Sequence, residues 1–187
     1  MPILPPEGDI HPESLLDDGS LGSSPECRWW ALYTLARREK DLMRRLRSLD
    51  IAHYGPLVKK RNRSPTGRIR TSQVPLFAGY VFLCGDEAAR YQAMTTNCIS
   101  RCLDVDDAGQ LLHDLRQIRR LILSETPMTP EARIQPGTQV RIRSGPLAGM
   151  EGIVVKRRGG DRLLVVVKFL QQGASIQIED FQVEAIS

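Results

Sequence analysis

Cysteine, histidine and aromatic residues are all scarce in this chain of 187 residues. There are four cysteines and three histidines, and Phe, Trp and Tyr together make up 5% of the sequence. Cys84, Cys98 and Cys102 stand among apolar neighbours, so we expect buried, reduced thiols there. The spacing of Cys98 and Cys102 would suit half of a zinc site, but no second pair accompanies it, and we therefore expect no bound metal.

Long apolar runs and catalytic signatures are missing as well. No stretch approaches the roughly 18–20 apolar residues that cross a bilayer, and the first residues lack the basic start and apolar stretch of a signal peptide. The histidines are scattered, and there is no paired carboxylate, phosphate-binding glycine loop or nucleophile motif. These gaps predict a cytoplasmic, non-enzymatic protein with no membrane contact and no cofactor.

Lysine and arginine are absent from residues 1–26, which contain six acidic residues together with many Pro, Gly and Ser residues. We expect a disordered acidic tail there. The rest of the chain has a net charge of +10, because it holds all 26 basic residues and 16 of the 22 acidic ones. Residues 28–70 alone contain thirteen basic and three acidic residues. Such a surface attracts nucleic-acid phosphates or the acidic face of a nucleic-acid machine, and a solvated helix face is the alternative interpretation.

Apolar periodicity predicts a mixture of strands and helices in the first two thirds of the chain. Strands are expected at 28–34, 51–60, 68–74, 80–84 and 99–105, and helices at 37–49, 86–94 and 111–123. The first helix is amphipathic with a basic outer face, and Asp86 can cap the second one. A polar segment at 61–67 reads as a loop or hairpin tip. This order predicts an α+β fold, in which an antiparallel sheet carries helices.

The composition changes after a proline-bearing linker at 126–131. From Gly137 onward about five short strands alternate with glycine-rich turns, which predicts a small all-β barrel. The segments 153–155 and 163–167 are rich in β-branched residues, which lose rotamer freedom in a helix. We therefore expect strands, and no helical alternative, in this part of the chain.

Two motifs carry a resemblance to a known family. The strand Trp-Trp-Ala-Leu-Tyr-Thr at 29–34 is followed at once by the basic helix with Glu39, and the run Pro-Leu-Phe-Ala-Gly-Tyr-Val-Phe occupies 75–82. Both are similar to the N-terminal domain of the NusG transcription factors, although Ala78 stands where the family has proline. Residues 137–154 resemble a KOW module, whose motif is carried by Val140, Arg141, Ile142, Gly145, Pro146, Gly149 and Gly152.

The resemblance covers about residues 28–187 and implies an organisation into parts. The expected parts are a disordered acidic tail at 1–26, a NusG N-terminal RNA polymerase-binding domain at 27–124, a linker at 125–136 and a KOW domain with an SH3-like barrel at 137–187. It also implies a function in transcription elongation and antitermination. In the family the N-terminal domain binds the clamp helices of the largest polymerase subunit and suppresses pausing. The KOW domain recruits a second partner, such as ribosomal protein NusE or termination factor Rho, and the protein is expected to be a monomer.

Site residues follow from the resemblance by position. Tyr33, Phe77, Tyr80 and Phe82 would line the polymerase-binding cavity, and their alternative role is in the core. Phe77 lies in a turn, where we expect an exposed anchor. The arginines of the basic helix would contact DNA or RNA phosphates, or would simply be solvated; they are Arg37, Arg38, Arg44, Arg45 and Arg47. The rival interpretation of the chain is a ribosome-associated RNA-binding protein that uses its KOW barrel.

Overall fold

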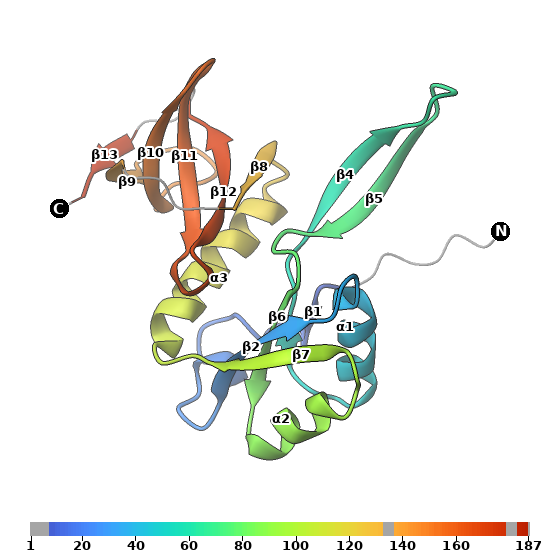
Figure 1. Ribbon diagram of the computed structural model, residues 1–187. Coiled ribbons are helices and arrows are strands. Elements are labelled where there is room, and N and C mark those ends of the chain that lie inside the picture. Colours follow the sequence, from blue (N-terminus) through green and yellow to red (C-terminus); the bar gives the residue numbers. More distant parts are fainter. Residues whose placement is uncertain (1–7, 133–136, 179–182, 187) are drawn as a thin grey trace. The chain divides into compact units, whose positions relative to one another are not determined.

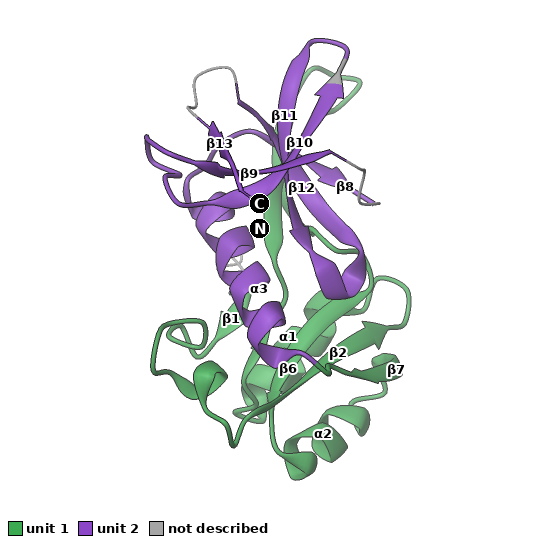
Figure 2. Cartoon of the chain, turned by 90° about the vertical axis from the view of Figure 1, so that its left-hand side faces the viewer, with its two compact units in different colours: residues 1–106 green, residues 107–187 purple. Residues whose placement is uncertain are grey.

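The structure, a computed structural model, describes residues 8–132, 137–178 and 183–186 (Figure 1). The chain divides into two compact units, an N-terminal unit at 1–106 and a C-terminal unit at 107–187 (Figure 2). Each unit combines antiparallel strands with helical structure of its own.

The N-terminal unit is built on a five-stranded antiparallel sheet with the order β1-β3-β6-β2-β7. Its elements are β1 (Ile10–His11), η1 (Leu21–Ser23), β2 (Arg28–Thr34), α1 (Glu39–Ser48), β3 (His53–Tyr54), β4 (Leu57–Arg63), β5 (Ile69–Pro75), β6 (Tyr80–Gly85), α2 (Glu87–Met94) and β7 (Ile99–Asp104). The predicted mixture of helices and antiparallel strands is confirmed. The expected strand at 51–60 is interrupted after Tyr54, and its second part belongs to a separate sheet.

Strand β2 is an interior strand of this sheet and pairs with both β6 and β7. Side chains alternate between the two faces of a strand, so the adjacent Trp29 and Trp30 point to opposite sides. Trp30 belongs to a core that includes Leu42 and Leu46 of α1 and Ala93 of α2. Its indole N–H donates to Asp104 Oδ1 at 2.8 Å, so the one polar group of this buried ring is paired.

The opposite face of β2 is covered by residues 8–26, and the expected disorder of this segment is wrong for its described part. Leu15 and Leu16 are buried, and the Trp29 indole N–H donates to the Gly22 carbonyl at 3.0 Å. β1 pairs with β3, which extends the sheet by one strand. Acidic composition suggested disorder, but a few apolar side chains suffice when they meet a large uncovered indole. Residues 1–7 lie outside the described residues.

The cysteines differ in part from expectation. Cys27 and Cys84 form a disulfide, with Cα atoms 5.8 Å apart, so the expectation of a reduced Cys84 is wrong. Their proximity results from the pairing of β2 with β6, which a sequence separation of 57 residues does not reveal. Cys98 and Cys102 are free thiols, and burial raises the pKa of both.

A long hairpin forms a second, two-stranded sheet in the N-terminal unit. β4 and β5 pair with each other from Leu57↔Pro75 to Arg63↔Ile69 and with no other described strand. Figure 1 shows this hairpin projecting from the rest of the unit. Residues 61–63, which were expected in a loop, continue β4, and only 64–68 turn the chain.

The C-terminal unit combines one helix with a six-stranded antiparallel sheet of order β13-β9-β10-β11-β12-β8. Its elements are α3 (Ala108–Leu123), β8 (Met128–Glu131), β9 (Thr138–Ile142), β10 (Glu151–Arg157), β11 (Gly160–Val167), η2 (Lys168–Leu170), β12 (Gln172–Gln177) and β13 (Val183–Ala185). Among the described residues after Gly137, every regular element is a strand except the short turn η2. The predicted strands of this region are therefore confirmed, and the exclusion of a helical alternative stays a prediction.

The expected linker contributes a strand to this sheet. β8 pairs with β12 in the register Ser175↔Thr129, and the Ser175 hydroxyl donates to Glu131 Oε1 at 2.7 Å. Arg162 of β11 donates to Thr129 Oγ1 at 3.0 Å. Thr129 favours a strand once an open sheet edge is available, and Pro130 fits the edge position of β8.

Helix α3 packs against β11 and η2 of the same unit. Its buried Asp114 accepts the backbone N–H of Lys168 at 2.9 Å, and Gln117 accepts that of Glu151 at 2.7 Å. Arg120 donates to the carbonyls of Pro146 and Ala148 at 3.2 and 2.6 Å. The compact units consequently divide at 106/107, before the helix, whereas the sequence places a linker after it. The boundaries of independently folding domains stay a prediction.

We expect α3 and β8 to stabilise the C-terminal sheet. A fragment of residues 107–187 should unfold at a higher temperature than one of residues 137–187, because the shorter fragment leaves the β12 edge open and the backbone groups of Lys168 and Glu151 without partners. Thermal unfolding followed by circular dichroism measures the difference.

Leu115→Ala in the longer fragment should lower its free energy of unfolding by about 2–5 kcal/mol, as buried Leu→Ala changes do. Equal midpoints for both fragments would contradict this role of the helix.

His53 of β3 is a buried titratable group in the N-terminal unit. Its Nδ1 lies 2.8 Å from the Ile51 carbonyl, and its Nε2 has no hydrogen-bond partner among the described residues. Burial lowers the pKa of His53 to about 4, and the neighbouring charges of Arg47 and His11 act in the same direction. The imidazole is therefore neutral in the folded protein at neutral pH.

This pKa predicts a loss of stability in mild acid. Between pH 6.5 and 4 the unfolded chain binds a proton at His53 that the folded chain does not, so the free energy of unfolding falls as the pH falls. The neutral His53 contributes about 3 kcal/mol to the free energy of unfolding at neutral pH, since each pH unit between the two pKa values corresponds to ~1.4 kcal/mol. Urea unfolding at a series of pH values should show a shallower fall for His53→Gln than for the unsubstituted protein. An equally steep fall for both proteins would contradict this role of His53.

Candidate functional site

A pair of tyrosines marks one surface of the N-terminal unit. Tyr33 and Tyr80 are cross-strand partners on β2 and β6, with ring centroids 5.1 Å apart. Tyr33 is 40% exposed and Tyr80 is half-buried. Two tilted rings that remain partly open to solvent offer a rigid apolar surface with polar tips, which is typical of protein-contact sites.

The turn after β5 holds these rings in place. Gly79 has a φ of +84°, and a Cβ atom there would lie 2.9 Å from the ring of Tyr33. The Gly79 N–H donates to Glu39 Oε1 of α1 at 2.7 Å, and its carbonyl accepts the Thr34 N–H at 2.8 Å. Glycine at this position therefore serves both the turn and the close approach of the aromatic ring.

The two phenylalanines of the same motif are in the interior. Phe77 is 1% exposed and Phe82 is fully buried, so the expected exposure of Phe77 is wrong. Hydrogen bonds of the turn fix the backbone on both sides of Phe77. The Leu76 N–H donates to the Pro56 carbonyl at 2.8 Å, and the Tyr80 N–H donates to the Phe77 carbonyl at 3.1 Å. In this conformation the Phe77 side chain lies in the interior. Of the four predicted contact residues, the structure leaves Tyr33 and Tyr80 accessible.

The predicted arginines of α1 differ from one another in what they contact. Arg38 and Arg45 both pair with Asp41, at 2.8 and 3.3 Å, and the hydrogen bond from Arg38 is the main cause that lowers the pKa of Asp41. Arg47 donates to the Ile10 carbonyl at 2.9 Å and so anchors β1. Arg44 donates to the Lys40 carbonyl at 3.3 Å. Arg37 precedes the helix, is exposed and has a φ of 60°.

A denser group of cations, which was not singled out as a site from the sequence, lies on the hairpin. Its six basic residues are all exposed: Lys59, Lys60, Arg61, Arg63, Arg68 and Arg70. No acidic residue occurs between 57 and 75, in contrast to α1 with its Glu39 and Asp41. The signal was the absence of acidic residues, which is visible in the sequence once the segment is recognised as a hairpin and not as a loop.

The motif residues of the C-terminal unit shape the turn between β9 and β10. Val140 and Ile142 are buried, and Arg141 pairs with Glu151 across the two strands. Gly145 and Gly149 have positive φ values of 88° and 83°. A Cβ atom at Gly152 would lie 2.6 Å from the Leu164 carbonyl oxygen, which explains the need for glycine within this strand. Pro146 is exposed, and its carbonyl is one of the two acceptors of Arg120.

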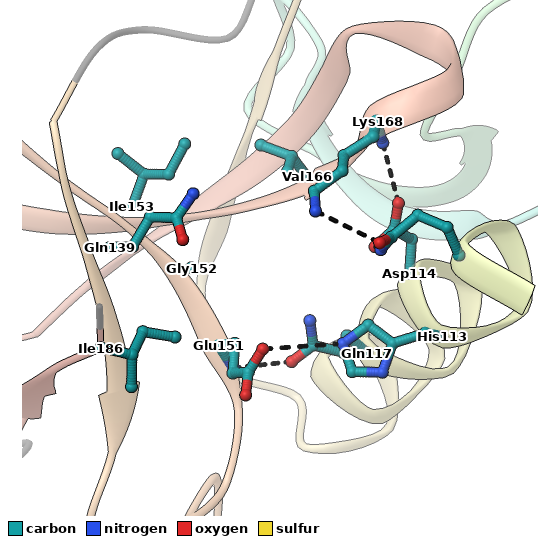
Figure 3. Close-up of a pocket in the computed structure, with 11 residues that line it drawn as sticks. His113, Asp114, Gln117, Gln139, Glu151, Gly152, Ile153, Val166, Lys168 and Ile186 are labelled. Atoms are coloured by element: carbon teal, nitrogen blue, oxygen red, sulfur yellow. Dashed lines mark hydrogen bonds and ion pairs between the residues drawn. The ribbon is translucent and has the colours of Figure 1, made fainter.

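A cavity of about 280 Å³ lies between α3 and the sheet of the C-terminal unit (Figure 3). Polar side chains of the helix face it: Gln117 accepts the backbone N–H of Glu151 on β10, and Asp114 accepts that of Lys168 in η2. The Lys168 ammonium donates to Gln110 Oε1 at 3.2 Å, and His113 lies 3.9 Å from Glu151. Burial raises the pKa of Asp114. Because these groups bond to one another, the arrangement serves the packing of the helix on the sheet.

Within residues 8–132, 137–178 and 183–186, no group of three or more His, Cys, Asp and Glu side chains could hold a metal ion. None of the helices in the described part of the chain is long and apolar enough to span a membrane.

Comparison with known proteins gives a family match. The family model described as transcription termination factor nusG matches residues 27–132, which is more than half of the chain. Among solved structures, a chain in the crystal structure of the MjSpt4:Spt5 complex in conformation B is similar, with 12% identity and a TM-score of 0.29 over 84% of this chain and 97% of that one. No curated protein matches the chain.

Burial of Phe77 leads to a prediction about stability. Phe77→Ala should lower the free energy of unfolding by roughly 3–5 kcal/mol, as truncation of a buried phenylalanine does. Tyr33→Ala, at the partly exposed neighbouring site, should cost clearly less. Equilibrium urea unfolding of the two variants measures both values. A Phe77→Ala protein as stable as the unsubstituted chain would place this side chain outside the core.

Proposed function

The chain belongs to the NusG family of transcription factors, and we propose that it promotes transcription elongation and antitermination by binding the clamp helices of the largest RNA polymerase subunit. The N-terminal unit would hold the clamp closed over the nucleic acid and so suppress pausing. This is a binding function, and it requires neither a catalytic group nor a cofactor.

One observation carries the proposal beyond family membership, namely the accessible Tyr33 and Tyr80 ring pair. The rings lie on neighbouring strands of a sheet whose opposite face is filled by α1 and α2, so their position is fixed by the fold. Rigid aromatic side chains that are partly exposed lose little conformational entropy on binding, which makes them suitable anchors for an apolar helical partner. Phe77 and Phe82 of the same motif are buried and are not accessible to a partner.

The C-terminal unit would provide a second binding function. Its β9–β10 turn has the glycine pattern of a KOW module, and we propose that the sheet forms an SH3-like barrel that recruits ribosomal protein NusE or termination factor Rho. The protein would act in the cytoplasm as a monomer, with contacts to DNA or RNA from its basic residues. Recruitment of a second protein lets one factor couple the polymerase to another machine.

Tyr33→Ala combined with Tyr80→Ala should weaken binding to the clamp helices by roughly 2 kcal/mol or more, which corresponds to about thirtyfold, because truncated anchor aromatics lose the area that they bury. Calorimetric titration of a clamp-helix fragment with the full chain measures the affinity. Pull-down from a lysate adds a second readout: polymerase subunits should be captured, and capture of ribosomal subunits alone would favour the rival ribosome-associated function.

Tyr91→Ala is the matched control. Tyr91 is a tyrosine of α2 that is 73% exposed, and α2 packs on the Trp30 face of the sheet, away from the Tyr33 face. Its truncation should leave the affinity unchanged. If the double tyrosine variant, folded by circular dichroism, binds the clamp helices with full affinity, then the proposed contact surface is wrong.

A further inference from the structure

The β4–β5 hairpin has a distribution of charge that differs from every other described element of the N-terminal unit. The six cations of the hairpin lie within twelve residues of sequence, from Lys59 to Arg70, and no carboxylate stands among them. They are exposed, whereas Arg38 and Arg45 of α1 share a carboxylate between them. The hairpin therefore concentrates positive charge that its own sequence does not neutralise.

The cations occupy both faces of the ribbon. Residues directly opposite each other on paired strands share a face, and successive residues alternate. Lys59, Arg61 and Arg63 accordingly lie on one face, opposite Gln73, Thr71 and Ile69. Lys60 lies on the other face opposite Ser72, together with Arg70 opposite Asn62. A ribbon that packed on a protein surface would have one apolar face, and this one has a charged group on each.

The tip of the hairpin is ordered by local bonds. The Arg68 N–H donates to Ser64 Oγ at 3.1 Å, the Ser64 N–H donates to the Arg68 carbonyl at 2.9 Å, and Gly67 has a φ of 82°. The Ser64 and Thr66 hydroxyls lie 2.7 Å apart. These bonds close the turn, and the polar side chains of Ser64 and Thr66 lie at the tip of the ribbon.

We propose that the β4–β5 hairpin binds double-stranded DNA by entering the major groove. That groove, about 12 Å wide in B-form DNA, admits a two-stranded β-ribbon. A ribbon inside the groove has a phosphate backbone on each side, so cations on both of its faces have partners. Arginine and lysine head groups at these positions would contact phosphates, and the polar side chains near the tip would face the base edges.

Other nucleic acids suit the hairpin less well. Residues 57–75 contain no aromatic side chain, so the hairpin lacks the stacking platforms with which proteins hold single strands. The major groove of an A-form RNA duplex is too deep and narrow for protein side chains to read. Duplex DNA is therefore the ligand that fits both the shape and the charge of the ribbon. The biological role of this DNA binding rests on the proposed transcription function, but the binding itself can be measured without polymerase.

The test uses the full chain and a fluorescently labelled duplex DNA of about 20 base pairs. Affinity is measured by anisotropy over a range of salt concentrations. Replacing Arg61, Arg63 and Arg70 with Gln should weaken binding at least tenfold near 0.1 M salt and reduce the slope of log K against log salt by about 2–3, since each phosphate contact contributes about 0.9. A comparison variant replaces Arg37, Arg44 and Arg45 with Gln, which removes the same charge from the α1 region, the rival candidate for DNA contact.

The results distinguish DNA binding by the hairpin from DNA binding by the α1 region, and they test whether the hairpin enters the major groove. A loss confined to the hairpin variant supports the proposal, and a loss confined to the α1 variant overturns it. Binding of single-stranded DNA or duplex RNA as tightly as duplex DNA would also overturn it. Guanine N7 atoms lie in the major groove, so their protection from methylation by the unsubstituted protein, lost in the hairpin variant, supports groove entry, and unchanged methylation contradicts it.

Polymerase capture with the same variants keeps this inference distinct from the proposed function. The hairpin variant should still bind the clamp-helix fragment, because Tyr33 and Tyr80 are unchanged. Full DNA binding by a hairpin variant that is folded by circular dichroism refutes the hairpin proposal alone. Unaltered polymerase binding by the double tyrosine variant refutes the polymerase surface and leaves the DNA result standing.

Discussion

Two adjacent tryptophans on the interior strand β2 determine what must cover the two faces of the sheet in the N-terminal unit. Trp29 and Trp30 lie on opposite faces of β2, so each face needs an apolar cover and a partner for one indole N–H. On one face α1 and α2 supply the cover, and Asp104 accepts the hydrogen bond. On the other face residues 8–26 supply it, and the Gly22 carbonyl accepts. The order of the N-terminal segment is thus a consequence of β2, and the disulfide at Cys27 joins the segment's end to β6.

Sequence periodicity was sufficient for those parts of the fold in which local pattern and tertiary environment agree. The aromatic strand at β2, the amphipathic α1 and α3 and the Asp86 cap of α2 are all present, and the Asp86 carboxylate accepts the Ala89 N–H at 2.8 Å. Local composition failed where a distant partner decides the structure. Residues 8–26 and β8 have the composition of tail and linker, and each becomes ordered because a sheet offers an uncovered face or edge.

The candidate site shows the same limit for single residues. The motif at 75–82 correctly marks the turn that brings Tyr80 beside Tyr33, yet the sequence cannot tell which of its aromatics face outward. Phe77 is buried because the backbone of its turn bonds to Pro56 and Tyr80, which are set by chain path and not by hydropathy. Likewise, charge counts locate the basic region, but only the contacts of Asp41 and Ile10 show that Arg38, Arg45 and Arg47 are already engaged.

The hairpin pairs with no strand of the five-stranded sheet, and this has a consequence for how such a protein can change. A substitution, insertion or shortening between residues 59 and 73 alters no register in the central sheet and opens no cavity in its core. The length and charge of this ribbon are therefore adjustable independently of the fold that carries it. Replacing the hairpin by one of different length or charge would change the ligand that this surface binds and leave the five-stranded sheet unchanged.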